Sequence, residues 1–199
     1  DELVTMFLAG HETTAIALSW SIILLSLNPQ ARRSLQDELD SVLRDRTPEA
    51  SDYSELPYTA AVFQEAMRLY PPLPITVRQA LGEDTLEGYP VKANSSIFVN
   101  FYSLHHNPDV WDNPEGFDPE RFLPGQVKER HRFAYSPFGG GPRQCIGNNF
   151  ALMEGVLALA MISQKFELNL CPGTDIRPHM PGTLRPKGGV PVIIKRRQM

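Results

Sequence analysis

The sequence predicts a mainly α-helical protein with small β-sheets, and two patterns carry that prediction. Apolar residues recur at helical spacing over four long stretches, which indicates amphipathic or buried helices. Short runs of β-branched and aromatic residues, separated by glycine turns, lie between and after these stretches and indicate short strands. We therefore expect a helical body that carries several small sheets.

Most of the expected helices have a recognisable boundary or an apolar stripe. The first is rich in Ala, Leu and Ile and ends at Asn28-Pro29, and the third ends at Pro71-Pro72. The second has an apolar stripe opposite a charged face, as expected for a helix on the surface of a core. The expected helices cover residues 3–27, 30–44, 59–70 and 146–165.

The segments between these helices are expected to be strands or loops. Residues 47–57 are polar and contain two prolines, which predicts a loop. Residues 105–138 are rich in Asn, Asp, Pro and Gly, and so long an irregular segment in a compact domain is often functional. Short strands are expected at residues 76–80, 85–89, 96–101, 166–170 and 190–195.

Length, net charge and cysteine content limit the classes of protein to which the chain can belong. The 199 residues suffice for one domain with a sizeable core, and the net charge of −4 does not indicate a nucleic-acid partner. Cys145 and Cys171 are too few for a disulfide framework, so one of them is expected to be a free functional thiol. The chain begins at Asp1 without a signal peptide, and we interpret it as starting within a longer protein. Residues 14–27 are uncharged but shorter than the ~20 residues of a membrane span, so we expect a core helix.

The most informative segment is FGGGPRQCIG, residues 138–147, with four glycines and a proline around Cys145. A helix expected directly after the cysteine and the nearby cation Arg143 both favour a thiolate, which is a ligand suited to haem iron. The alternative is a phosphate-binding glycine loop. A Walker A loop needs Lys and Ser/Thr where Gln144-Cys145 stand, and Ser136-Pro137 argues against the strand of a dinucleotide fingerprint. The loop by itself favours a haem thiolate and leaves the alternative open.

This segment resembles the haem-binding signature of the cytochrome P450 superfamily, F-G-x-G-x-R-x-C-x-G, at every fixed position. The resemblance implies that the cofactor is haem b, iron protoporphyrin IX, and that Cys145 is the axial ligand of its iron. It also implies that Arg143 contacts a haem propionate. The remaining signature residues would shape the loop, namely Phe138, Gly139, Gly141 and Gly147.

A second unusual segment, AGHETT at residues 9–14, lies within the first expected helix. A glycine and adjacent polar residues cost stability in an apolar helix, and such a departure suggests a functional site. A zinc-protease motif is rejected because Ala15 stands where the second histidine is needed. The alternative is that Thr13 and Thr14 only bond back to the carbonyl one turn before them.

The same segment resembles the oxygen-activation motif of the P450 family, [A/G]-G-x-[D/E]-T-[T/S]. The resemblance implies three catalytic residues. Gly10 would kink or open the helix so that O₂ and water fit, Thr13 would hydrogen-bond the bound oxygen, and Glu12 would relay protons from solvent. His11 has no fixed role in the motif and is expected to be structural or exposed to solvent.

Glu65 and Arg68 lie three residues apart on one face of the third expected helix. Such a pair is weak evidence by itself, but P-E-R-F follows at residues 119–122, as in the P450 family. The resemblance implies a buried structural triad of Glu65, Arg68 and Arg121 that pins the irregular segment leading to the cysteine loop. It also implies that Arg78 faces a haem propionate, with an ordinary strand-edge arginine as the alternative.

A basic cluster precedes the cysteine loop and offers a docking hypothesis. An acidic redox partner would be steered to it, although most charge runs are only solvated surfaces. We expect Thr76 and Val77 to line the substrate pocket, and no role is assigned to Cys171. The docking cluster comprises Lys128, Arg130, His131 and Arg132. Structural roles are expected for His105, His106, Trp111 and His179.

Four family motifs in the family's order imply that the chain is the C-terminal half of the P450 fold. Residues 1–199 would be the haem-binding portion of a single domain whose N-terminal portion is absent. The implied reaction is insertion of one atom of O₂ into an apolar small molecule. Electrons would come from NAD(P)H through a ferredoxin, flavodoxin or reductase domain. The alternatives are an inactive haem-binding fragment and a haem carrier or sensor module. The expected location is the cytoplasm, with a membrane anchor in the absent portion left open.

Overall fold

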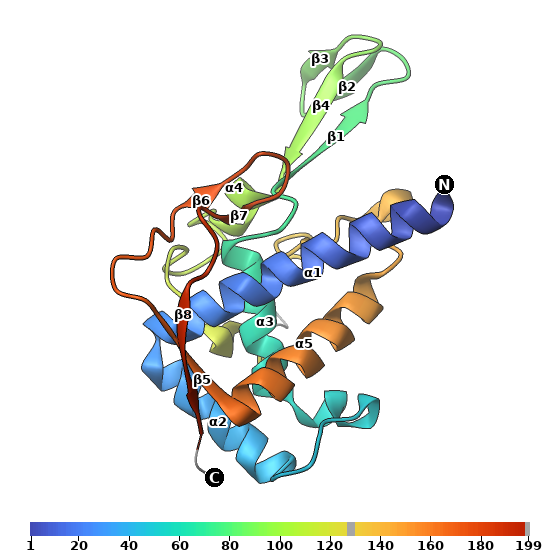
Figure 1. Cartoon of the computed structure of the whole chain (residues 1–199). Helices are drawn as coiled ribbons and strands as arrows, with labels where there is room; N and C mark the ends of the chain where they lie inside the picture. Colours follow the sequence, from blue (N-terminus) through green and yellow to red (C-terminus); the bar gives the residue numbers. More distant parts are fainter. Residues whose placement is uncertain (127–129, 198–199) are drawn as a thin grey trace.

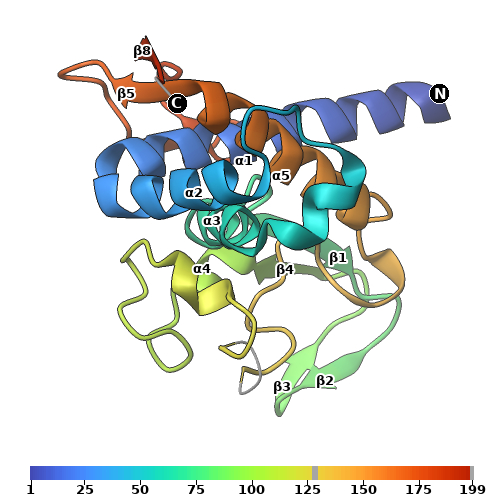
Figure 2. The ribbon, with the colours of Figure 1, turned by 90° about the horizontal axis from the view of Figure 1, so that it is seen from below.

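The computed structural model describes residues 1–126 and 130–197. Its body consists of four long helices, α1, α2, α3 and α5 (Figure 1). Helix α3 is central. The other three long helices pack against one side of it, and the 3₁₀ turn at residues 119–122 and the short helix α4, Phe101–His105, contact the other side (Figure 2). All four expected helices are confirmed to within a few residues: α1 Glu2–Leu27, α2 Pro29–Val42, α3 Pro57–Leu69 and α5 Asn148–Lys165.

The helices are held together by apolar side chains that their periodicity brings to one face. In α2 the buried positions Ala31, Leu35 and Leu39 follow the i, i+4 spacing of a single stripe. Helix α5 approaches α3 so closely that a Cβ added to Gly155 would lie 2.1 Å from Cζ of Phe63. A larger residue at position 155 would therefore force the Phe63 ring or α5 to shift.

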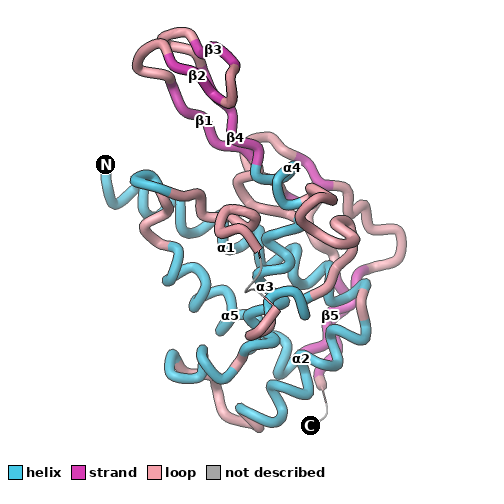
Figure 3. Tube along the Cα trace, turned by 180° about the vertical axis from the view of Figure 1, so that it is seen from behind, coloured by secondary structure: helices cyan, strands magenta, loops and turns pink. Residues whose placement is uncertain are grey.

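Small antiparallel sheets surround this body in the described chain, and each has two strands. The ladder of β1 and β4 projects from the helices and carries the β2–β3 hairpin at its tip (Figures 1 and 3). The other two sheets lie near the C-terminus. The paired strands are β1 Ile75–Gln79 with β4 Ser96–Asn100, β2 Asp84–Leu86 with β3 Tyr89–Val91, β5 Phe166–Leu170 with β8 Val192–Arg196, and β6 Pro178–His179 with β7 Arg185–Pro186.

Several short elements differ from expectation. The single strand expected at residues 85–89 is a hairpin, because Glu87 and Gly88 both have positive φ (50° and 84°), which suits a tight turn between twisted strands. Helix α4, Phe101–His105, occupies residues expected to end a strand and begin the irregular segment, and the Asn100 side chain caps it. The loop expected at 47–57 contains a 3₁₀ helix, Ala50–Glu55.

Helix α1 is divided between the core and an uncovered surface. Among the described residues it is the one helix long and apolar enough to cross a membrane, with a mean hydropathy of 1.3 over its most apolar window. However, 44% of that window is buried within the protein, and Trp20 stacks on Tyr70 with ring centroids 3.7 Å apart. The C-terminal half of α1 is thus a core helix, as expected. The exposed apolar residues of its N-terminal half are Leu3, Val4, Met6, Phe7 and Leu8.

Candidate functional site

The glycine-rich loop at residues 138–147 is closed by its own backbone. The N–H of Cys145 donates to the carbonyl of Phe138 at 2.9 Å, so the loop returns on itself just before the cysteine. Gly139 and Gly141 both have φ of +70°, a conformation that other residues adopt only with strain. These two glycines therefore fix the shape of the loop, and a Cβ on Gly141 would point into open space.

Cys145 is exposed and free of any disulfide. Helix α5 begins at Asn148, so the expectation of a helix directly after the cysteine is corrected by two residues. The reason is that the Cys145 N–H is bonded across the loop to Phe138 rather than lying free in a first helical turn. Because the effect of a helix dipole falls off within one turn, it supports a thiolate less strongly here than expected. A Cβ on Gly147 would lie 3.9 Å from Sγ of Cys145, so the glycine keeps the sulfur uncovered.

Arg143 and Arg78 line one open hollow of about 580 Å³. Arg143 comes from the cysteine loop, whereas Arg78 comes from β1, and both side chains are exposed. Among the described residues, Arg78 bonds only to Thr76 and the carbonyl of Val77 on its own strand. Thr76 and Val77 line the same hollow. Two cations from distant segments thus face one space next to the cysteine loop, as an anionic ligand requires.

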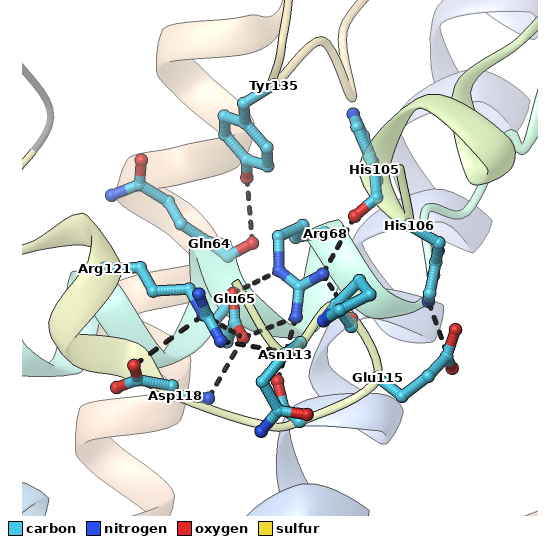
Figure 4. Close-up of polar contacts among 12 residues, drawn as sticks. Gln64, Glu65, Arg68, His105, His106, Asn113, Glu115, Asp118, Arg121 and Tyr135 are labelled. Atoms are coloured by element: carbon cyan, nitrogen blue, oxygen red, sulfur yellow. Dashed lines mark hydrogen bonds and ion pairs between the residues drawn. The ribbon is translucent and has the colours of Figure 1, made fainter. Parts of the chain in front are cut away.

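Glu65 and Arg68 form a buried ion pair on α3, and neither side chain is exposed (0% and 0%). The carboxylate accepts two bonds from Arg68, at 2.6 and 2.8 Å, in a bidentate arrangement (Figure 4). The other donors of Arg68 bond the carbonyls of His105, Pro114 and Gly116 at 2.7–2.9 Å. All five guanidinium N–H groups are therefore paired.

Arg121 joins this pair less tightly. Its Nε lies 3.5 Å from Oε1 of Glu65 and makes no hydrogen bond within the described part of the chain, while its Nη2 donates to the carbonyl of Asn113. The Asp118 N–H donates to the same Glu65 oxygen at 3.0 Å. Burial raises the pKa of Glu65, and the bonds from Arg68 and Asp118 oppose that shift. The three residues of the expected triad are thus brought together, with Arg68 as its dominant donor.

The segment at residues 9–14 lies on an unbroken α1. The Thr13 hydroxyl donates to the carbonyl of Ala9 at 2.6 Å, as the alternative interpretation predicted. The Thr14 hydroxyl is buried and has no hydrogen-bond partner among the described residues. Glu12 is exposed; it accepts a bond from Thr183 at 2.9 Å and lies 3.9 Å from Nη1 of Arg185.

Sequence reasoning did not find Thr183 and Arg185. They lie about 170 positions from Glu12 in the chain and belong to no motif, so no local pattern marks them. They reach α1 because the neighbouring carbonyl of Leu184 accepts the indole N–H of Trp20 at 2.8 Å.

The expected docking cluster is only partly a surface feature. Lys128 lies outside the described residues. Arg130 turns inward, with its guanidinium 4.6 Å from the Trp111 ring centroid and a bond to the carbonyl of Arg121. Burial accordingly lowers the pKa of Arg130. Arg132 is exposed and lies over the ring of Phe133. Of the expected docking arginines, Arg132 is therefore the one available to a partner.

The residues around Cys145 fit a large, flat, mostly apolar cofactor that carries anionic groups and binds through sulfur. Apolar side chains after the cysteine are uncovered, with Ile146, its neighbour in the chain, at 94% exposure and Phe150, in the first turn of α5, at 72%. The cysteine loop lies at the same end of the molecule as the exposed N-terminal half of α1 (Figures 1 and 2). An accessible soft donor, two arginines at one hollow and uncovered apolar surface match the requirements of a thiolate-bound haem. This combination defines a protein of the haem-thiolate class.

Comparison with known proteins agrees with this class. The family model described as cytochrome P450 matches residues 1–194, and the chain belongs to that family. It is 46% identical over 197 residues to cytochrome P450 132 of Mycobacterium tuberculosis, covering 99% of this chain and 42% of that protein. The protein LUTEIN DEFICIENT 5 of Arabidopsis thaliana is 43% identical over 87% of this chain, with 30% of its own length covered.

Cyclooctatin synthase of Streptomyces melanosporofaciens is 43% identical over 89% of this chain and is covered over 39% of its length. The chain therefore spans well under half the length of each of these relatives. The relatives named here come from bacteria and from a plant, where the protein is chloroplastic.

Proposed function

We propose that the chain is the C-terminal, haem-binding portion of a single P450 domain that acts as a haem-thiolate monooxygenase. The complete protein inserts one atom of O₂ into an apolar organic substrate and releases the other as water. Electrons come from NAD(P)H through a redox partner. The observation that carries this proposal is the uncovered thiol of Cys145 in a glycine loop beside two arginines at one hollow.

The residues of the cysteine loop would hold haem b. Bound haem supplies an iron centre that activates O₂, with the thiolate as an electron-donating ligand. The sulfur of Cys145 would bind the iron, and the guanidiniums of Arg143 and Arg78 would pair with the propionates. Gly139 and Gly141, which carry no side chain, would allow the backbone to approach the flat cofactor closely.

Glu12 and Thr13 would deliver protons from α1. The Thr13 hydroxyl uses its hydrogen in the bond to Ala9, so its oxygen remains free to accept a further hydrogen bond. Glu12 is exposed and accepts a bond from Thr183, so its carboxylate would be able to exchange protons with solvent. Proton transfer through positioned groups of this kind typically contributes about 10²–10⁴-fold in rate.

One relative supports an apolar substrate. It is named carotene epsilon-monooxygenase and is 39% identical to this chain over 201 residues. Carotene is a hydrocarbon, so the substrate pocket of such a protein must be apolar. For the redox partner we propose a ferredoxin, flavodoxin or reductase domain that docks near Arg132, and we propose a cytoplasmic location.

The test of haem ligation is the carbon monoxide difference spectrum of the reduced, haem-loaded protein. We expect the band of thiolate-ligated haem, its loss in Cys145→Ser, and its retention in Cys171→Ser. Cys171 is a matched control, because it is the second free cysteine and lies directly after β5, where its N–H bonds the carbonyl of Pro191 beside β8, away from the cysteine loop. A properly folded wild-type protein without the thiolate band would overturn the proposal.

Thr13 separates a monooxygenase from a haem carrier or sensor. In a monooxygenase, Thr13→Ala should lower the ratio of product formed to NAD(P)H consumed, with more peroxide released. Thr13→Ser, which keeps the hydroxyl, should restore that ratio. A carrier or sensor would show the same haem binding and ligand response in wild type and both variants.

A further inference from the structure

Helix α4 lies between the Glu65–Arg68 pair and the cysteine loop, and it contacts both. At its first residue, Cζ of Phe101 lies 3.9 Å from the position of a Cβ on Gly139. At its last residue, His105 contacts Arg68 on one side and Ser136 on the other. A five-residue helix that the sequence does not reveal therefore supports the loop directly at Gly139 and indirectly through Ser136, two residues before the loop.

His105 makes this connection with two different groups. Its carbonyl accepts a bond from Nη1 of Arg68 at 2.8 Å, and Nε2 of its ring accepts the N–H of Ser136 at 2.9 Å. The residue is completely buried. Burial lowers the pKa of His105 to about 3, so the ring is neutral near pH 7, with Nε2 as the acceptor and the proton on Nδ1.

Backbone bonds continue from Ser136 to the cysteine. The carbonyl of Ser136 accepts the N–H of Gly139 at 3.0 Å, and the carbonyl of Phe138 accepts the N–H of Cys145 at 2.9 Å. Ser136 is itself buried, and its hydroxyl bonds the carbonyl of Phe133. A displacement of Ser136 must therefore move Phe138, and with it the residue that would bind haem.

We infer that His105 is the positioning residue that connects the Glu65–Arg68 pair to the cysteine loop and so sets the position of the Cys145 sulfur. The effect of His105 on haem ligation by Cys145 rests on the proposed function, whereas its effect on the position of the loop does not. A histidine that only filled space in the core could be replaced by Phe, which is similar in size. The acceptor at Nε2 is what Phe lacks, and Gln can supply an oxygen at nearly the same reach.

The test compares His105→Phe and His105→Gln by residue-resolved amide hydrogen exchange in the ligand-free chain. A buried N–H that loses its acceptor opens at least about tenfold more easily. We expect Ser136 and Cys145 to exchange about tenfold faster or more in His105→Phe and close to the wild-type rate in His105→Gln. In the haem-loaded protein, the thiolate share of the carbon monoxide band should fall in His105→Phe and recover in His105→Gln.

His106→Phe is the matched control, because the His106 ring bonds the carbonyl of Tyr102 within α4 and makes no bond to the loop. It should leave the exchange of both amides and the spectrum unchanged.

If His105→Phe does not fold, His105→Asn replaces it, since its shorter side chain cannot reach Ser136. Faster exchange at Ser136 without a change at Cys145 or the spectrum would overturn the inference, as would failure of Gln to restore a folded protein. A wild-type protein without the thiolate band would refute the proposed function. The exchange rates of the Ser136 and Cys145 amides would still test whether His105 positions the loop.

Discussion

Replacement of Arg68 by Lys tests how much the buried framework contributes to stability. All five donors of Arg68 are paired, two with Glu65 and three with backbone carbonyls. Lys keeps the positive charge but has three donors on one nitrogen, so at least two acceptors lose their partner. Each buried acceptor left unpaired costs about 1–3 kcal/mol, which gives about 2–6 kcal/mol for two. This range brackets the roughly 3–5 kcal/mol lost when a buried ion pair is broken.

We therefore expect Arg68→Lys to lower the free energy of unfolding by about 4 kcal/mol. Urea denaturation followed by circular dichroism measures this loss, and the dependence of the free energy on urea should not change. Arg177→Lys is the control, because Arg177 bonds Asp175 at the surface and the substitution should leave the midpoint unchanged. A loss of less than about 1 kcal/mol, the size of an exposed pair, would refute the reasoning.

Three further predictions concern packing, the loop and pH. Gly155→Ala should destabilise the protein by about 1–3 kcal/mol or more, because its Cβ would overlap the Phe63 ring; an unchanged thermal midpoint would show that α5 can move away. Gly139→Ala should cost about 1–2 kcal/mol through its positive φ and should weaken haem retention, measured by transfer of haem to an acceptor protein; unaltered retention contradicts this. The bond from Arg46 lowers the pKa of Asp52 from 3.8 to about 2, so its stabilising effect is complete above pH 4 and is lost as pH falls toward 2. The wild type should therefore unfold at a higher urea concentration than Asp52→Asn at pH 6, and the difference should shrink below pH 4.

The sequence predicts the long helices well because their signals are local. The stripe of α2 and the prolines at 29 and 71 need no knowledge of distant residues. The cysteine loop is a contiguous motif that can be recognised locally, whereas the Glu65–Arg68 pair is weak evidence by itself and gains its expected role from the resemblance to the P450 family.

The missed features depend on distant contacts. His105 bonds Ser136 across 31 residues and Glu12 bonds Thr183 across 171, and in neither case does the sequence mark the partner. The sequence indicates that Arg130 is part of a basic surface, yet its guanidinium lies over the ring of Trp111. The sequence places the start of α5 two residues too early, because no local pattern shows that the Cys145 N–H bonds back to Phe138.

The bonds from Arg68 to carbonyls at 105, 114 and 116 also have a consequence for folding order. The segment they hold has little regular structure of its own, so one side chain of α3 satisfies backbone groups 37 to 48 residues away. That segment cannot become ordered before α3 is in place, and the two should gain protection from exchange together as one cooperative unit. Because these contacts span 37 to 48 residues, we expect the docking of this segment to follow the formation of the local helices.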